Sequence, residues 1–191
     1  MSSSLRFGLI GCGDFGKYLG AYIQEVARVV ALCDPNERGL ETTARHLRLD
    51  VPRYTDFRRL LADAEVDAVA VTAANFAHEQ ITVAAAEAGV HVFCEKAMAR
   101  TVPECWRMVR ACQAHRVKLM IGHKRRLRPP WARMVELTRP ELVGRPLAVT
   151  VCQYTDNRPY NFFDTWWARP ELGGGFFRYS TTRDWRIPHF E

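Results

Sequence analysis

A glycine-rich segment near the N-terminus constrains the fold of this chain more than any other feature of the sequence. The segment reads Gly11, Cys12, Gly13, Asp14, Phe15 and Gly16. It follows the apolar run Leu5 to Ile10, which predicts a strand, and it opens a stretch with helical spacing. In such a unit the first glycine permits a tight turn, the second lets a pyrophosphate approach, and the third allows close helix packing. The segment is therefore a candidate dinucleotide site, and a glycine turn without a ligand is the alternative.

An acidic residue at the end of the next apolar run bears on which dinucleotide is expected. Val29 to Cys33 predicts a second strand, and Asp34 follows it directly. A carboxylate at this position accepts hydrogen bonds from the ribose hydroxyls of NAD and repels the 2′-phosphate of NADP. NAD is therefore the expected cofactor. Arg38, one helical turn further on, keeps NADP as the less favoured alternative, and a simple turn role for Asp34 before Pro35 also stays open.

Apolar runs alternate with helical patterns as far as Gly122. Further strands are predicted for Ala68 to Thr72, Val90 to Cys94 and Lys118 to Ile121, the last counted as the sixth strand. Helices are predicted for Asn36 to Leu47, Asp56 to Leu61, Phe76 to Ala88 and Thr101 to Cys112. Strands that are apolar on both faces require helices on both sides of the sheet. Residues 1–122 are therefore expected to form an α/β domain with a doubly wound parallel sheet of the Rossmann type.

The pattern changes after Gly122. A helix is predicted near Pro130 to Leu137 and a β-like run at Leu147 to Tyr154, so residues 123–191 are expected to begin a second domain. The basic run His123 to Arg128, with Trp131 nearby, could in principle meet phosphates. Nucleic-acid binding is kept as a minor hypothesis, and no nucleic-acid partner is expected.

The composition is that of an ordinary globular protein, with 48% hydrophobic and 25% charged residues in a chain of 191. The apolar stretches fall far short of the roughly 18 residues that a membrane span needs, and the N-terminus shows no secretory signal. A cytoplasmic protein with no membrane partner is expected. The six cysteines form no C-x-x-C pair and the histidines lack metal-ligand spacing, so reduced thiols and no metal site are expected.

Five stretches of the sequence carry a family resemblance: Arg6 to Gly13, Asp67 to Val69, Asn75, His78 and Ala88 to Lys96. They are similar to the Gfo/Idh/MocA oxidoreductases, which include glucose-fructose oxidoreductase and inositol dehydrogenase. The likeness covers about residues 5 to 175, and its most specific element is Glu95-Lys96. The resemblance implies a Rossmann domain followed by an α/β domain with an open, mostly antiparallel sheet.

The resemblance also implies an activity. Family members move hydride between C4 of the nicotinamide of NAD(P) and a hydroxyl carbon of a sugar, polyol or related small molecule. Lys96 occupies the place of the family's catalytic lysine, which positions or protonates the substrate oxygen, and Glu95, Asn75 and His78 are implied on the cofactor side. A homo-oligomer is implied for a full-length form. From the residues alone, Lys96 could simply cap a strand beside Glu95, and His78 could be a surface or capping residue.

Two turns depart from the family pattern. Ala73-Ala74-Asn75 replaces Thr-Pro-Asn, and Ala97 replaces the proline that follows the lysine. In the family a cis peptide bond often precedes that proline. Because a non-proline cis bond costs roughly 2.5–4 kcal/mol, Ala97 is expected to lack it.

The end of the chain departs further. After the glycines at 173–175, Tyr179 and Arg183 stand where the family has an Asp and a His, and the chain stops at Glu191. A truncated C-terminal domain is therefore expected, with doubtful turnover. The alternative function is a non-catalytic dinucleotide-binding fragment.

Overall fold

The computed structural model describes residues 4–145, 147–148, 169 and 172. Contacts divide the chain into two compact units, residues 1–122 and residues 123–191. Most of the β-like run expected at Leu147 to Tyr154 lies outside the described residues, as do Tyr179 and Arg183. All the candidate site residues lie in the first unit.

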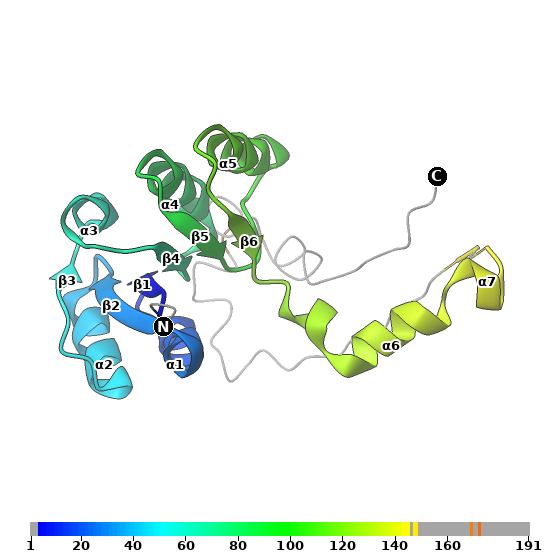
Figure 1. The fold of residues 1–191 in the computed structure, drawn as a ribbon, viewed down its shortest axis with the longest axis horizontal. Helices are drawn as coiled ribbons and strands as arrows, with labels where there is room; N and C mark the ends of the chain where they lie inside the picture. Colours follow the sequence, from blue (N-terminus) through cyan, green and yellow to red (C-terminus); the bar gives the residue numbers. More distant parts are fainter. Residues whose placement is uncertain (1–3, 146, 149–168, 170–171, 173–191) are drawn as a thin grey trace. The chain divides into compact units, whose positions relative to one another are not determined.

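The first unit is built on a parallel sheet of six strands (Figure 1). The strands are β1 (Arg6–Ile10), β2 (Arg28–Cys33), β3 (Arg53–Tyr54), β4 (Ala68–Val71), β5 (His91–Cys94) and β6 (Leu119–Ile121). Their order is β3-β2-β1-β4-β5-β6, that of two mononucleotide-binding halves that meet between β1 and β4. The predicted doubly wound parallel sheet is confirmed. The sequence did not locate β3, because two residues carry no periodicity.

Five helices connect these strands: α1 (Asp14–Val26), α2 (Glu37–Leu47), α3 (Phe57–Asp63), α4 (Asn75–Glu87) and α5 (Val102–Ala114). In Figure 1, α1 and α2 lie on one side of the sheet, and α3, α4 and α5 lie on the other. Three of these helices begin at a residue whose side chain caps them. The side chains of Asn36 and Asp56 accept hydrogen bonds from first-turn amides, and Thr101 forms a capping box with Glu104.

Both faces of the sheet are buried, as the apolar runs require. Because neighbouring residues of a strand point to opposite faces, Leu9 packs in a cluster with Leu40 of α2. Ile10 packs instead in the cluster that contains Ile81 of α4 and Met108 of α5. The five described cysteines are free, and four of them are buried in this core.

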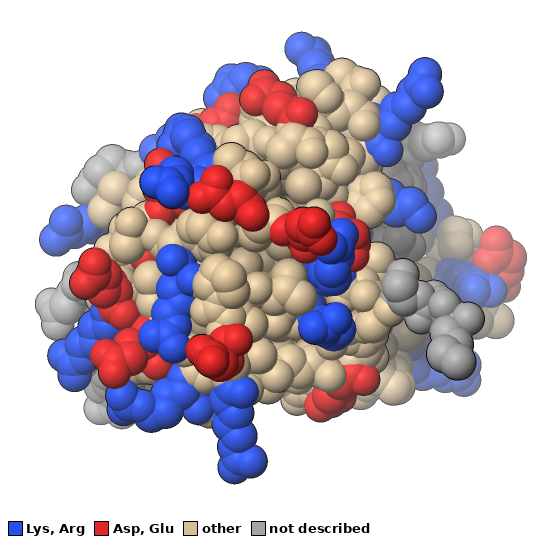
Figure 2. Space-filling view, turned by 60° about the vertical axis from the view of Figure 1, so that its left-hand side comes forward, with Lys and Arg blue, Asp and Glu red and all other residues tan. Residues whose placement is uncertain are grey.

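The surface of the first unit carries charges of both signs. Figure 2 shows Lys and Arg side chains interspersed with Asp and Glu over one face. Exposed pairs join Arg45 to Glu41 at 2.8 Å and Arg59 to Asp63 at 3.2 Å. Among the described residues, no helix has the length and apolar character needed to cross a bilayer.

The described part of the second unit consists of short helical elements. They are the 3-10 helix η1 (Lys124–Leu127), α6 (Pro129–Leu137) and α7 (Pro140–Val143). The helix predicted near Pro130 to Leu137 is confirmed by α6. The guanidinium of Arg125 lies 5.6 Å from the centre of the Trp131 ring, a cation–π contact within this unit. Its described residues contain no strand, so the expected antiparallel sheet is not shown.

Candidate functional site

The predicted site residues lie at the carboxyl edge of the sheet. Gly11 to Gly16 follow β1, Asp34 follows β2, Asn75 begins α4 after β4, and Glu95 and Lys96 follow β5. Because parallel strands end at the same edge, these segments meet around the point where the strand order reverses, between β1 and β4. Open α/β sheets bind ligands at this point.

The glycine loop packs closely against the turn after β4. Gly11 has a φ of 106°, a backbone conformation that side chains rarely adopt. A Cβ at Gly11 would overlap the amide of Ala73, and one at Gly16 would overlap the carbonyl of Gly11. The hydroxyl of Thr72 donates to the same Gly11 carbonyl at 2.6 Å. The protein's own backbone therefore requires the first and third glycines.

Gly13 leaves space for a ligand. A Cβ at this residue would meet no protein atom within 4 Å. Gly13 is also the N-cap of α1 and supplies no side chain to the first-turn amides, in contrast to Asn36 at the start of α2. Asp14 is exposed and pairs with Lys17 at 3.1 Å. An open backbone at this helix N-terminus fits the pyrophosphate of a dinucleotide.

Asp34 links the glycine loop to the end of β2. Its Oδ2 accepts a hydrogen bond from the Cys12 amide at 2.7 Å, and its Oδ1 accepts one from the Asn36 amide at 2.8 Å. A carboxylate offers about four lone-pair sites, so both oxygens can still accept ribose hydroxyls. Arg38 is exposed in the first turn of α2. The turn role and the ligand role of Asp34 are therefore compatible.

Lys96 lies in the turn after β5, beside a buried carboxylate. Glu95 is 6% exposed, and its Oε2 accepts a hydrogen bond from the Lys96 amide at 3.1 Å. The peptide bond between Lys96 and Ala97 is cis. The expectation that Ala97 would lack the cis form is therefore wrong. Although no proline ring is present, contacts with the surrounding fold hold this turn. One of these contacts, from His78, reaches the Ala97 carbonyl.

His78 is buried in the first unit. It projects from α4 and is 1% exposed. Its Nδ1 lies 2.8 Å from the carbonyl oxygen of Ala97, and its Nε2 lies 2.9 Å from that of Ala73. The interpretation of His78 as a surface or capping residue is wrong, because its ring spans the turns after β4 and β5. Asn75, at the start of the same helix, is buried as well.

Burial gives His78 a pH-dependent effect on stability. Burial lowers the pKa of His78 from its ordinary value of 6.5, and this outweighs the opposing effect of the Ala97 and Ala73 carbonyls. Because the unfolded chain then binds the proton more readily, stability is full above about pH 6.5 and falls as the pH drops below it. The loss amounts to at most one proton, about 1.4 kcal/mol per pH unit.

We expect His78→Phe to flatten the acid side of the stability profile, measured by urea unfolding at a series of pH values. His115→Phe serves as the control, because His115 is exposed. An identical slope below about pH 6.5 in the wild type and His78→Phe would contradict the assignment to His78.

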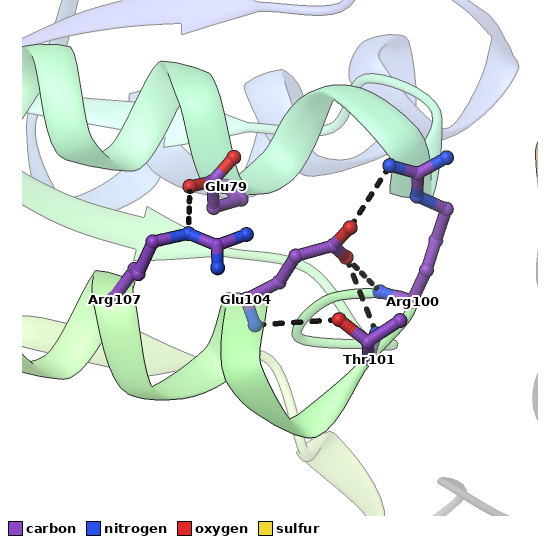
Figure 3. A network of polar contacts seen from close by, with 5 residues as sticks. All are labelled: Glu79, Arg100, Thr101, Glu104 and Arg107. Atoms are coloured by element: carbon purple, nitrogen blue, oxygen red, sulfur yellow. Dashed lines mark hydrogen bonds and ion pairs between the residues drawn. The ribbon is translucent and has the colours of Figure 1, made fainter.

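Glu104 fixes the far end of the turn that carries Lys96 (Figure 3). The Glu104 side chain is 10% exposed. Its Oε2 accepts hydrogen bonds from the amides of Arg100 and Thr101 at 2.9 and 3.2 Å, and its Oε1 accepts one from the Arg100 guanidinium at 2.9 Å. Nearby, Arg107 of α5 donates to Glu79 of α4 at 2.7 Å. The segment between β5 and α5 is thus tied down at both ends.

Glu104→Ala is expected to destabilise the first unit by about 1.5–3 kcal/mol, because it leaves amide donors without their charged acceptor. Urea unfolding measures the loss. Glu79→Ala, which removes a more exposed ion pair on the neighbouring helix, should cost at most about 1 kcal/mol. Equal losses in the two variants would show that Glu104 has no special part in holding the turn.

Sequence reasoning missed several residues that shape the site. Thr43 donates to the Cys12 carbonyl at 2.8 Å, and Thr72 holds the Gly11 carbonyl. A Cβ at Gly122 would lie 2.6 Å from Oε1 of Glu95, although the sequence marked this glycine only as a junction. The threonines gave no signal, whereas a glycine directly after a strand is a sign of close backbone approach.

Known proteins share the sequence pattern of the first unit. Residues 5–123 match the family model GFO_IDH_MocA, described as an oxidoreductase family with an NAD-binding Rossmann fold. The 2,7-anhydro-N-acetylneuraminate hydratase of Mediterraneibacter gnavus is 44% identical over 122 residues, which cover 63% of this chain and 32% of that protein. An inositol 2-dehydrogenase/D-chiro-inositol 3-dehydrogenase of Halalkalibacterium halodurans is 33% identical over 150 residues, covering 76% of this chain and 43% of that protein.

Solved structures share the fold. The WlbA dehydrogenase from Bordetella pertussis, solved with NADH and UDP-GlcNAcA, matches with a TM-score of 0.66 and 27% identity over 70% of this chain and 41% of its own. An oxidoreductase from Agrobacterium radiobacter, solved with NAD+, L-tartaric acid and magnesium, matches with a TM-score of 0.69 and 25% identity over 75% of this chain and 42% of its own.

The chain spans between about a third and less than half of the length of these proteins. The family match covers more than half of the chain, and it includes the glycine loop and the turn that carries Lys96. The chain therefore belongs to the Gfo/Idh/MocA oxidoreductase family, with an NAD-binding Rossmann fold.

Proposed function

We propose that the first unit is the cofactor-binding half of an NAD-dependent oxidoreductase that moves hydride between nicotinamide C4 and a hydroxyl carbon of a sugar, polyol or related small molecule. The observation that carries the proposal is the position of the glycine loop, Asp34 and Lys96 at one edge of the sheet. Relatives named as inositol dehydrogenases, and a WlbA dehydrogenase solved with a UDP-sugar derivative, support this substrate class.

The residues at the carboxyl edge fit the parts of the cofactor. The open backbone at Gly13 would hold the pyrophosphate, and Asp34 would accept the ribose hydroxyls. Asn75, Glu95 and Lys96 belong to the neighbouring turns, which we assign to the nicotinamide side. When bound, NAD supplies the hydride acceptor.

Lys96 is proposed as the catalytic residue. Hydride leaves an alcohol carbon productively only when the hydroxyl proton also leaves, and a neutral lysine amine can take up that proton. In the opposite direction the ammonium returns it. The backbone of Lys96 is held by Glu95 while its side chain is partly exposed, which suits a group that meets a substrate from solvent.

We assign residues 123–191 to the start of a substrate domain with a mostly antiparallel sheet. For the full-length protein we propose a homo-oligomer. A cytoplasmic location suits the buried free thiols. The alternative function is a non-catalytic dinucleotide-binding fragment. Turnover, rather than cofactor binding, separates the two.

The cofactor preference is tested by titrating the chain with NADH and NADPH and following nicotinamide fluorescence. We expect NADH to bind at least about tenfold more tightly, corresponding to about 1.4 kcal/mol, because Asp34 repels a 2′-phosphate. Asp34→Asn keeps an oxygen acceptor but removes the charge, so it should reduce this ratio. Arg38→Ala tests the NADP alternative separately, because it removes the charge that would bind a 2′-phosphate. Tighter binding of NADPH by the wild type would overturn the role given to Asp34.

A further inference from the structure

We propose that His78 is a positioning residue that couples the glycine loop to the turn carrying Lys96. The proposal rests on the proposed function, which places both segments in one site. Its basis is the ring itself, whose two nitrogens lie 2.9 Å from the Ala73 carbonyl and 2.8 Å from the Ala97 carbonyl. These carbonyls belong to two different turns of the chain.

On one side, the path from His78 leads to the glycine loop. The amide of Ala73 lies so close to Gly11 that a Cβ on the glycine would overlap it. The preceding residue, Thr72, donates its hydroxyl hydrogen to the Gly11 carbonyl at 2.6 Å. A movement of Ala73 is therefore transmitted directly to the loop that would hold the pyrophosphate.

On the other side, the path leads to Lys96. Ala97 is the next residue in the chain and is 2% exposed, so its carbonyl has little freedom to find another partner. The Lys96 amide is fixed from the opposite direction by Glu95 at 3.1 Å. The direction in which the Lys96 side chain leaves the backbone thus depends on where His78 holds Ala97.

An imidazole suits this position because it places two polar atoms on opposite sides of one rigid ring. A carbonyl oxygen only accepts, and a neutral ring carries a single N–H, so the ring donates to one turn at a time. Buried at 1% exposure, it has no water to replace a lost partner. The two turns therefore share one N–H of the same side chain, which lies on Nδ1 or on Nε2 according to the tautomer.

Three substitutions of His78 separate the two contacts. His78→Phe keeps the volume of the ring but removes both nitrogens. The amide nitrogen of Asn takes roughly the place of Nδ1, so His78→Asn retains a donor to Ala97, whereas His78→Gln reaches toward Ala73. Ile81→Ala is the matched control, because it removes buried volume from the same helix and leaves both ring nitrogens of His78 in place.

Two measurements on the 191-residue chain report on the two turns. The rate of Lys96 acylation by an amine-reactive ester, read by mass spectrometry against exposed Lys118, reports on the turn after β5. Hydrogen exchange of the Gly11 and Cys12 amides, which donate to the Cys33 carbonyl and to Asp34, reports on the glycine loop. Both are made below the midpoint of thermal unfolding, with and without NADH.

We expect His78→Phe to change both readouts by about fivefold or more. His78→Asn should restore the Lys96 rate but not the loop exchange, and His78→Gln should do the reverse. Ile81→Ala should lower thermal stability and leave both readouts near those of the wild type. His78 variants that behave like Ile81→Ala would overturn the proposal.

The outcome for His78 is distinguishable from the outcome for the proposed function. If the wild type binds neither NADH nor NADPH, the proposed function fails. The opposite responses expected of His78→Asn and His78→Gln in Lys96 acylation and loop exchange, measured without NADH, still decide whether His78 contacts both turns.

Discussion

Lys96→Met is expected to lower the rate of the hydride-transfer step by about 10²–10⁴-fold while leaving NADH affinity within a few-fold of the wild type. Methionine keeps much of the length of the side chain but cannot accept or return the proton of a substrate hydroxyl. The Lys96 amide that bonds to Glu95 is part of the backbone, so the substitution leaves that contact in place. The effect should therefore fall on the chemical step.

The measurement is a single-turnover assay of NAD⁺ reduction with a sugar or polyol, combined with an NADH titration. Lys118→Met is the control, because Lys118 is exposed just before β6, at the amino edge of the sheet. An unchanged rate for Lys96→Met would mean that Lys96 only caps the end of β5.

The two glycine substitutions Gly13→Ala and Gly16→Ala should both weaken NADH binding but differ in their effect on folding. At Gly13 a methyl group meets no protein atom within 4 Å, so the unfolding free energy should fall by no more than the N-cap preference for glycine over alanine, about 1 kcal/mol. The methyl group would, however, occupy the space proposed for the pyrophosphate. An overpacking cost of about 1–3 kcal/mol corresponds to roughly a 5- to 150-fold loss of NADH affinity.

At Gly16 a methyl group overlaps the carbonyl of Gly11, so the backbone itself must move. We expect Gly16→Ala to lower both the unfolding free energy and NADH affinity. Thermal unfolding and nicotinamide fluorescence measure the two effects. Folding weakened as much in Gly13→Ala as in Gly16→Ala, or unchanged folding in Gly16→Ala, would refute the separate roles given to the second and third glycines.

Much of the first unit could be predicted from the sequence, because a doubly wound sheet requires strands that are apolar on both faces. Ala68 to Val71 and His91 to Cys94 show such runs, and the helix starts at Asn36, Asp56 and Thr101 follow local capping chemistry. The glycine loop could be located for the same reason, since its spacing is a local requirement of the turn. The strand β3 could not, because so short an element is defined by its neighbours.

The candidate site was less predictable where contacts join distant segments. The place of His78 between Ala73 and Ala97 depends on the distance between two turns, and no sequence pattern encodes that distance. The sequence also gives no sign of the cis Lys96–Ala97 bond, because alanine in place of proline favours the trans form. Local propensity predicts single turns well but does not predict how two turns support each other.

Every residue assigned to the cofactor lies between Gly11 and Lys96, and so within one unit of the fold. A site assembled in this way can be inherited as a module, independently of whatever chain follows it. Similar sequence recurs in relatives named as an inositol 2-dehydrogenase/D-chiro-inositol 3-dehydrogenase and as a 2,7-anhydro-N-acetylneuraminate hydratase, of which this chain covers 43% and 32%. Under the proposed function, substrate choice can then diversify outside residues 11–96, because no group proposed to hold the cofactor has to change with it.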